Sequence, residues 1–271
     1  MAEVSANGLR HHVQRLGGGS QTVVFLHGLV VDNLSGYYFT LANPVAQMAD
    51  VILYDLRGHG MSERSPSGYR IDDFVADLEG ILIALDVHHP VSLVGNSFGG
   101  VLALSYAHRN PDRVRGVAVV DGHFPLPGWG TEMASTLELE GEQRDLKIAE
   151  LYKDWHAKDI SRKRRRLVKN AEFLVYESTL LADLRASAAL SESQLASIST
   201  PVLGLYGEHS ELVARAREVA KLLPNFDLHL LPHCSHQAMF EAPELVRQHV
   251  LVWLEGLEGL EGLKRLEGQS C

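Results

Sequence analysis

Cysteines and long apolar runs are scarce in this 271-residue sequence. The two cysteines, Cys234 and Cys271, stand in neither a metal-binding nor a redox spacing. No apolar run reaches the length that spans a bilayer, and residues 1–30 lack the charged and then apolar pattern of a secretion leader. We therefore expect a protein without a membrane span that works in the reducing cytoplasm.

Positive charge is also in deficit, with 25 lysine and arginine residues against 34 aspartate and glutamate residues and a formal net charge of −9. This balance disfavours nucleic acid and anionic membranes as general partners. The basic run Arg162–Arg166 is a local exception to this balance. Such a run more often forms a solvated helix face than a site for a polyanion. Hydrophobic residues make up 45% of the chain, which is enough for one large or two small domains with a core.

Short apolar runs alternate with segments of helical length along most of the chain. Predicted strands occupy residues 9–16, 22–26, 51–54, 91–94, 114–120, 201–206 and 226–230. Predicted helices occupy residues 37–48, 71–85, 98–108, 212–222 and 243–255. Alternation of this kind is typical of an α/β fold, in which helices cover both faces of a mostly parallel sheet.

The alternation breaks between residues 124 and 195, where the sequence is rich in charged residues, leucine and alanine. Helical patterns at about 133–156, 161–178 and 180–189 predict that residues 124–195 form an inserted helical cap. Residues 1–123 and 196–257 would then form the α/β core. Glycine at every third position weakens a helix, so residues 258–271 are predicted to be a flexible, low-complexity tail.

The rest of the chain is organised around Ser97, which lies in the pattern Gly95-Asn96-Ser97-Phe98-Gly99 between a predicted strand and a predicted helix. This arrangement is typical of a nucleophile elbow, a turn so sharp that only glycine fits at its flanks. The serine hydroxyl is then exposed above the sheet, and the helix starts directly beneath it. The five-residue pattern alone occurs by chance, and the flanking strand and helix give it its weight.

In order along the chain, these motifs resemble the α/β-hydrolase family. The resemblance covers about residues 9–255 and rests on His27-Gly28, the loop 55–62, the turn 95–99, and Cys234-Ser235-His236 with residues 241–244 beyond it. It implies that Ser97 is the nucleophile and that His236, in the loop after the last strand, is the base that removes its proton. His233 is the fallback for the base. The chemistry needs no metal and no organic cofactor.

The catalytic acid departs from the family pattern, because Ser210 stands where relatives commonly carry an aspartate. We favour Asp121, at the carboxyl end of the preceding strand, a place where haloalkane dehalogenases and some lactone hydrolases put their acid. Glu208 or Glu211 would be the alternative, reaching over with a longer side chain. A third possibility is a reduced pair of serine and histidine without an acid.

The family pattern implies an oxyanion hole made by the backbone amides of Leu29 and Phe98. In this arrangement His27 more often braces the loop that carries Leu29 than reacts. The side chain of Asn96, beside the nucleophile, either bonds within the sheet or faces the pocket, and the sequence leaves both open.

We therefore predict a serine hydrolase that cleaves a carboxylic ester, lactone or thioester of a small-molecule acyl substrate. The substrate is either free or bound to a carrier. The serine excludes haloalkane dehalogenase and epoxide hydrolase chemistry, which use an aspartate in its place. Alternatives are a thioesterase or cyclase acting on a carrier-bound acyl chain, a carbon–carbon bond hydrolase, and a binding protein without activity. Four aromatic residues of the predicted cap, Trp129, Trp155, Phe173 and Tyr176, either line the pocket or pack between cap and sheet.

Overall fold

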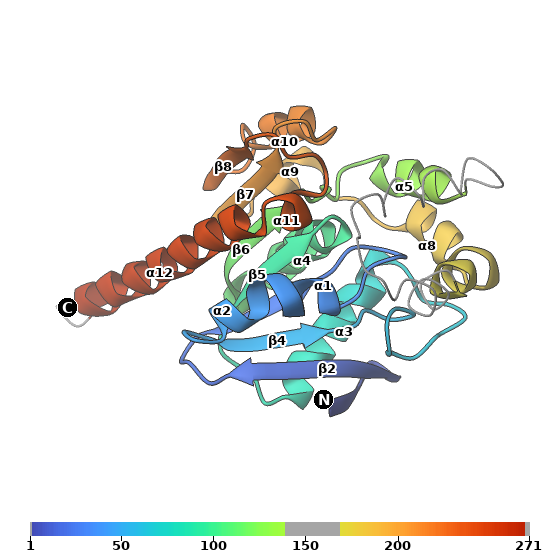
Figure 1. Ribbon diagram of the computed structural model, residues 1–271, viewed down its shortest axis with the longest axis horizontal. Helices are drawn as coiled ribbons and strands as arrows, with labels where there is room; N and C mark the ends of the chain where they lie inside the picture. The colour runs from blue at the N-terminus through green and yellow to red at the C-terminus, as the bar shows by residue number, and fades with distance from the viewer. Residues whose placement is uncertain (1, 139–168, 269–271) are drawn as a thin grey trace.

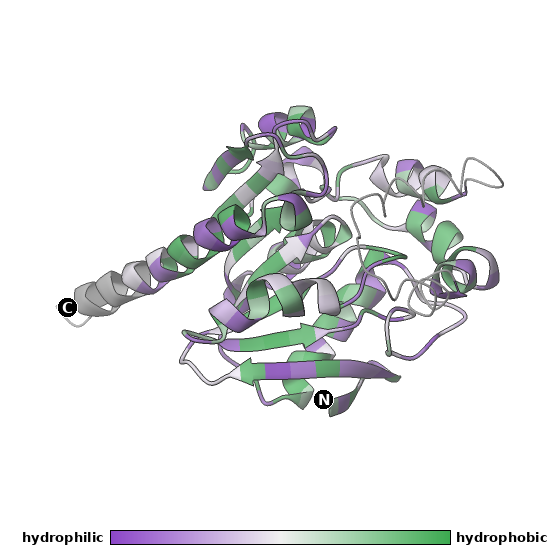
Figure 2. Ribbon diagram, in the orientation of Figure 1, coloured by the Kyte–Doolittle hydropathy of each residue, from purple (hydrophilic) through white to green (hydrophobic). Residues whose placement is uncertain are grey.

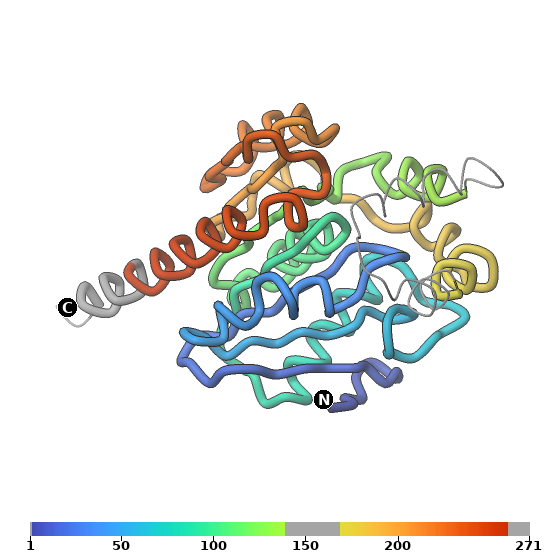
Figure 3. Tube along the Cα trace, viewed as in Figure 1, coloured from blue at the N-terminus to red at the C-terminus, as the bar shows by residue number. Residues whose placement is uncertain are grey.

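An eight-stranded sheet forms the centre of the computed structural model, which describes residues 2–138 and 169–268. The strands lie in the order β1-β2-β4-β3-β5-β6-β7-β8. They are β1 (Ala2–Ala6), β2 (Leu9–Gly17), β3 (Thr22–Leu26), β4 (Asp50–Tyr54), β5 (Val91–Asn96), β6 (Val114–Val120), β7 (Val202–Gly207) and β8 (Phe226–Leu231). Figure 3 traces the chain from the N-terminal strands at one edge of this sheet to β8 at the other.

Strand β2 alone runs against the direction of the other strands in the sheet. Strands β4, β3, β5, β6, β7 and β8 are parallel, whereas β2 runs antiparallel to β4 and β1 antiparallel to β2. The seven predicted strands are confirmed within two residues at either end. The eighth strand, β1, was not predicted, because its sequence Ala-Glu-Val-Ser-Ala alternates too weakly to stand out.

Alternate side chains of the central strands enter two different cores. Val24 of β3 packs on one face of the sheet and Val23 on the other, because successive side chains of a strand point to opposite faces. The first face is covered by α3 (Ile71–Ala84) and α4 (Phe98–Arg109), and α10 (Val213–Val219) also packs there. Figure 2 shows apolar residues concentrated in the central strands, as expected for a sheet buried on both faces.

The second face is covered by the N-terminal helical segment and the C-terminal helix. The predicted helix 37–48 is three consecutive helical pieces, α1 (Ser35–Tyr37), the π-helical η1 (Tyr38–Ala42) and α2 (Asn43–Val45). The short α11 (Ala238–Glu241) and the long α12 (Pro243–Gly268) complete this layer. A short 3₁₀ turn, η2 (Pro111–Arg113), joins α4 to β6.

Helix α12 is longer than the sequence predicted, since it continues past residue 255 to Gly268. Leu254 and Leu257 are buried, and Leu257 packs where Gly116 of β6 leaves room, so the packing extends the helix into the glycine-rich repeat. Figure 1 shows α12 projecting beyond the sheet. Within residues 2–138 and 169–268, α12 included, no helix combines the length and the hydropathy of a membrane span.

Between β6 and β7 the described residues form helices and no strand. These are α5 (Trp129–Leu137), the π-helical η3 (Phe173–Glu177), α8 (Leu180–Ala186) and α9 (Glu192–Ala196). Figure 1 shows α5 and α8 grouped beside the sheet, on the side toward which β4 points. The basic run Arg162–Arg166 lies outside the described residues, as does most of the first predicted cap helix.

Candidate active site

Ser97 occupies a strained turn between β5 and α4. Its φ of 51° and ψ of −112° are conformations that L-residues rarely adopt. Glycines make the turn possible: a Cβ at Gly95 would lie 2.2 Å from the carbonyl oxygen of Gly99, and one at Gly99 would lie 1.9 Å from that of Leu26. The sharp turn predicted from the sequence is therefore present, and it places Ser97 at the carboxyl end of the parallel strands.

Backbone hydrogen bonds join this turn to the end of β6. The amide of Ser97 donates to the carbonyl oxygen of Val120 at 3.2 Å. The carbonyl oxygen of Ser97 accepts from the amides of Gly100 and His123, both at 3.1 Å. Because Asp121 lies between these anchors, the nucleophile turn and Asp121 are held as one unit.

Asp121 is completely buried and carries a positive φ of 40°. Its Oδ2 atom accepts a hydrogen bond of 3.0 Å from the amide of Gly207, the last residue of β7. Burial raises the pKa of Asp121 to about 7. The Ser210 hydroxyl and the Gly207 amide oppose this rise, whereas the charge of Glu211 adds to it.

Ser210, at the family's usual acid position, thus lies beside the buried carboxyl group. It is itself buried, and its amide donates to the carbonyl oxygen of Gly207 at 2.9 Å. Since the hydroxyl of Ser210 is among the groups that lower the pKa of Asp121, it supports the anionic form of a carboxylate on the neighbouring strand.

His236 lies in the segment between β8 and α11 and is half-buried. The chain just before it packs on the end of β7, because a Cβ at Gly207 would lie 2.2 Å from the carbonyl oxygen of Ser235. Gly207 is also the residue whose amide binds Asp121. The end of β7 therefore lies between the backbone leading to His236 and the carboxylate of Asp121.

The ring of His123, which the sequence did not single out, lies beside that of His236. The centre of its ring is 5.8 Å from that of His236 and 6.1 Å from that of Trp129. Burial, and next the nearby His236, lower the pKa of His123 to about 3. His123 is therefore neutral at pH 7. The only available signal was its place two residues after Asp121.

The two alternatives that the sequence offered are arranged differently. Glu208 and His233 are exposed, and Oε2 of Glu208 accepts a hydrogen bond of 3.2 Å from the amide of His233. Glu211 influences Asp121 through its charge, but the buried carboxyl group beside Gly207 is that of Asp121. Of the acids considered, Asp121 is the one that combines burial with a place between β6 and β7.

The loop that carries Leu29 lies against the nucleophile, since a Cβ at Gly28 would be 3.5 Å from Cβ of Ser97. Leu29 itself is half-buried. On one side, the amide of Gly28 donates to Asp32 at 2.9 Å. On the other side, the amide of Val30 donates to Nε2 of His59 at 2.7 Å. Val30 has a φ of 68°, a strained value for a β-branched residue, and the two hydrogen bonds on either side of Leu29 support this conformation.

Two buried histidines maintain this loop. Nε2 of His27 accepts from the amide of Leu56 at 3.0 Å, in line with the bracing role expected of it. His59 must be neutral to accept from the amide of Val30, and burial lowers its pKa to about 3. The positioning contributions of His59 and Asp32 were missed, because contacts between distant loops leave no local pattern.

The aromatic ring of Phe98 connects the site to the segment that follows β6. Phe98 is fully buried as the first residue of α4, and its ring stacks on Trp129 with a centroid distance of 5.8 Å. Of the other aromatic candidates, Phe173 packs against the guanidinium of Arg64, Tyr176 is about half exposed, and Trp155 lies outside the described residues. The side chain of Asn96 makes no hydrogen bond within the part of the chain that the structure describes.

Comparisons with known proteins agree with this architecture. A family model described as alpha/beta hydrolase fold matches residues 21–243. The chain is 26% identical to 2-(acetamidomethylene)succinate hydrolase of Mesorhizobium japonicum, covering 88% of this chain and 89% of that protein. It is 27% identical to 2-hydroxy-6-oxononadienedioate/2-hydroxy-6-oxononatrienedioate hydrolase 2 of Pseudomonas putida, covering 91% and 92%. The solved enol-lactonase of Burkholderia xenovorans LB400 superposes with a TM-score of 0.74 at 23% identity, covering 94% of this chain and all of that chain.

Proposed function

Since the chain belongs to the α/β-hydrolase family, we propose that it is a serine hydrolase that cleaves a carboxylic ester, a lactone or a thioester through an acyl-enzyme on Ser97. The observation that carries this proposal is the left-handed backbone of Ser97 where β5 meets α4. Strain at a turn is retained where function requires it, and this turn places a half-buried serine at the start of a helix.

In the first half of the reaction, Oγ of Ser97 attacks the substrate carbonyl carbon and His236 takes the hydroxyl proton. The negative charge that develops on the carbonyl oxygen is met by the amides of Leu29 and Phe98. The clamped conformation of Val30 and the hydrogen bond from Gly28 to Asp32 support this role for Leu29. His236 then protonates the departing alcohol or thiol, and the acyl group stays on Ser97.

In the second half, His236 removes a proton from water, whose oxygen attacks the acyl carbon. The acid is released and Oγ of Ser97 regains its proton. Asp121 is proposed to orient His236 and to stabilise its imidazolium form. A positive charge on His236 favours the anionic form of Asp121, which opposes the rise in the pKa of this carboxyl group that burial causes.

We assign substrate selection to residues 124–195, the proposed helical cap over a core of residues 1–123 and 196–257. The stacking of Trp129 on Phe98 supports this assignment, because it brings the segment to the nucleophile turn. A cytoplasmic location is proposed with it and is testable by cell fractionation.

Carbon–carbon bond hydrolysis is the second candidate. It is favoured by the named activity of the Pseudomonas putida relative, which aligns over 91% of this chain. The same serine, histidine and oxyanion-binding amides would serve it.

A substrate panel separates these reactions. Purified protein is assayed with short-chain aryl esters, acyl thioesters, lactones and a 2-hydroxy-6-oxo-dienoate, with Ser97→Ala as the control for each. Ester or lactone turnover that Ser97→Ala abolishes supports the proposal. A preference for the thioester would point to a carrier-bound acyl chain. Turnover of the dienoate alone would replace the proposal by the second candidate.

A further inference from the structure

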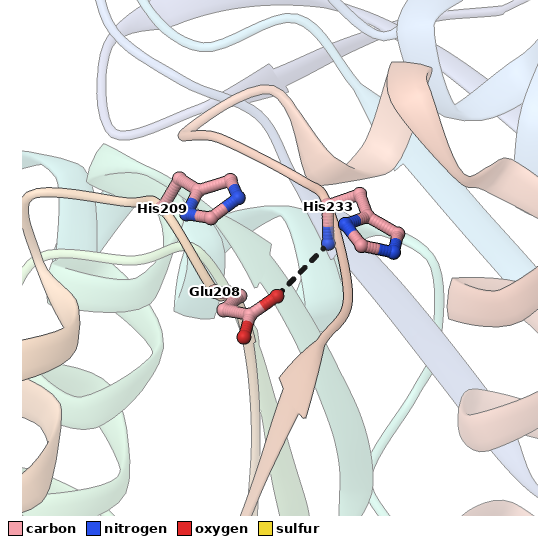
Figure 4. Close-up of side chains that lie close together, drawn as sticks. All are labelled: Glu208, His209 and His233. Carbon is pink, nitrogen blue, oxygen red and sulfur yellow. Dashed lines mark hydrogen bonds between the residues drawn. The ribbon is translucent and has the colours of Figure 1, made fainter.

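Three side chains with metal-binding atoms gather at the surface, outside the steps described above. Glu208 and His209 follow β7, and His233 follows β8. All three are exposed, and one ligand atom from each lies within 4.8 Å of the others. Figure 4 shows the carboxylate of Glu208 between the two histidines.

The backbone holds these three residues in place. The amide of Glu208 donates to the carbonyl oxygen of Leu231, and that of His209 to the carbonyl oxygen of Cys234, both at 2.9 Å. The amide of His233 donates to Oε2 of Glu208, as the dashed line in Figure 4 marks. His233 also has a φ of 61°, so this segment has a defined left-handed turn. The two segments are thus fixed before any ligand binds.

Apart from Oε2 of Glu208, the metal-binding atoms of the three side chains have no hydrogen-bond partner among the described residues. Within the described ranges 2–138 and 169–268, neither the imidazole of His209 nor that of His233 makes a hydrogen bond or an ion pair. Among the described residues, the Oε1 atom of Glu208 also makes no hydrogen bond or ion pair. Two imidazoles and a carboxylate with one oxygen left over give this surface the donors of a cation site.

We propose that Glu208, His209 and His233 bind a divalent transition-metal ion, with zinc as the best match. Imidazole suits zinc, copper and nickel, whereas magnesium and calcium prefer oxygen ligands alone. Zinc takes nitrogen and carboxylate ligands at about 2.0–2.2 Å, which places neighbouring ligands about 3.3 Å apart in a tetrahedron. The exposed side chains close the remaining gap by rotation about their χ angles, and water takes the fourth position.

Such an ion would tie together the two segments that meet behind the proposed active site. Glu208 follows Gly207, whose amide binds Asp121, and His233 precedes His236 by three residues. Metal binding therefore restrains the backbone that positions the proposed acid and base. Binding itself does not depend on the proposed hydrolase activity, so it is tested without substrate.

The test titrates tag-free protein, stripped by a chelator, with zinc chloride in a calorimeter. Wild type is expected to bind one zinc ion, and Glu208→Gln, His209→Ala and His233→Ala each to lose at least about tenfold in affinity. His88→Ala is the matched control, because His88 is an exposed histidine beside Asp86 elsewhere on the surface. It should bind as wild type does. Circular dichroism of each variant without metal checks that it is folded.

Hydrogen exchange supplies the second measurement. Zinc should slow amide exchange in residues 207–210 and 231–236 of wild type and leave exchange in Glu208→Gln unchanged. Absence of saturable one-to-one binding to wild type would overturn the proposal. So would variants that bind with wild-type affinity, since zinc would then occupy other surface histidines.

Discussion

Replacing Asp121 by asparagine should lower activity and raise stability in the same protein. Asparagine keeps the shape and an oxygen that accepts the hydrogen bond from Gly207. It does not stabilise an imidazolium at His236, so turnover should fall by up to about 10⁴-fold, the loss known for the corresponding change in a serine protease.

The stability effect follows from the direction of the pKa change. Burial raises the pKa of Asp121 from 3.8 to about 7, so the folded state binds this proton more tightly than the unfolded state. The carboxyl group costs nothing below pH 3.8, and its cost grows as the pH rises to about 7. The difference corresponds to about 4 kcal/mol at 1.4 kcal/mol per pKa unit, an upper limit that a positive charge on His236 reduces.

The assay is urea unfolding of wild type and Asp121→Asn at several pH values between 5 and 8. The variant should be more stable at pH 8 by up to about 4 kcal/mol, and its advantage should shrink by about 1.4 kcal/mol per pH unit below pH 7. Asp86→Asn, at a side chain that is 94% exposed and also has a left-handed backbone, should show no such dependence. An advantage that does not change with pH, or a variant with wild-type turnover, would refute the reasoning.

Two further substitutions test the packing that positions the site. Asp77→Ala leaves the buried guanidinium of Arg57 without its carboxylate and should lower the free energy of unfolding in urea by about 3–5 kcal/mol. Asp72→Ala, on the same helix but in an exposed ion pair, should lower it by at most about 1 kcal/mol. Equal effects of the two substitutions would contradict the account. Gly99→Ala forces a Cβ to 1.9 Å from a backbone carbonyl oxygen of β3 and should abolish folding. Gly256→Ala, whose Cβ would meet nothing within 4 Å, should leave the melting temperature unchanged or raised. A folded Gly99→Ala protein would refute the close approach of α4 to β3.

The sheet could be predicted from the sequence because its strands are short, continuous apolar runs that must be buried on both faces. β1 escaped prediction, since it is an edge strand whose few buried side chains pack on α3. The C-terminal part of α12 was also not predicted. Local propensity argued against a glycine-rich helix, and the packing of Leu257 against β6 outweighed it.

In the candidate site, too, local features could be predicted from the sequence and contacts between distant segments could not. Ser97 could be placed because its turn is local, and the structure bears out the sharp backbone that its flanking glycines predict. The choice among Asp121, Glu208 and a serine–histidine pair could not be made from the sequence. The hydrogen bond between Asp121 and Gly207 joins strand ends that lie 86 residues apart in the chain, so no local pattern reveals it, and the choice of Asp121 as the acid stays a prediction.

The central claim, that Ser97 is a nucleophile activated by its surroundings, is tested most directly by labelling with a fluorophosphonate. The folded protein should gain the mass of one phosphonyl group, and peptide mass spectrometry should locate it on Ser97. Ser97→Ala and heat-denatured protein should gain none, and His236→Ala should react much more slowly. An unlabelled Ser97 in folded wild-type protein would contradict the account.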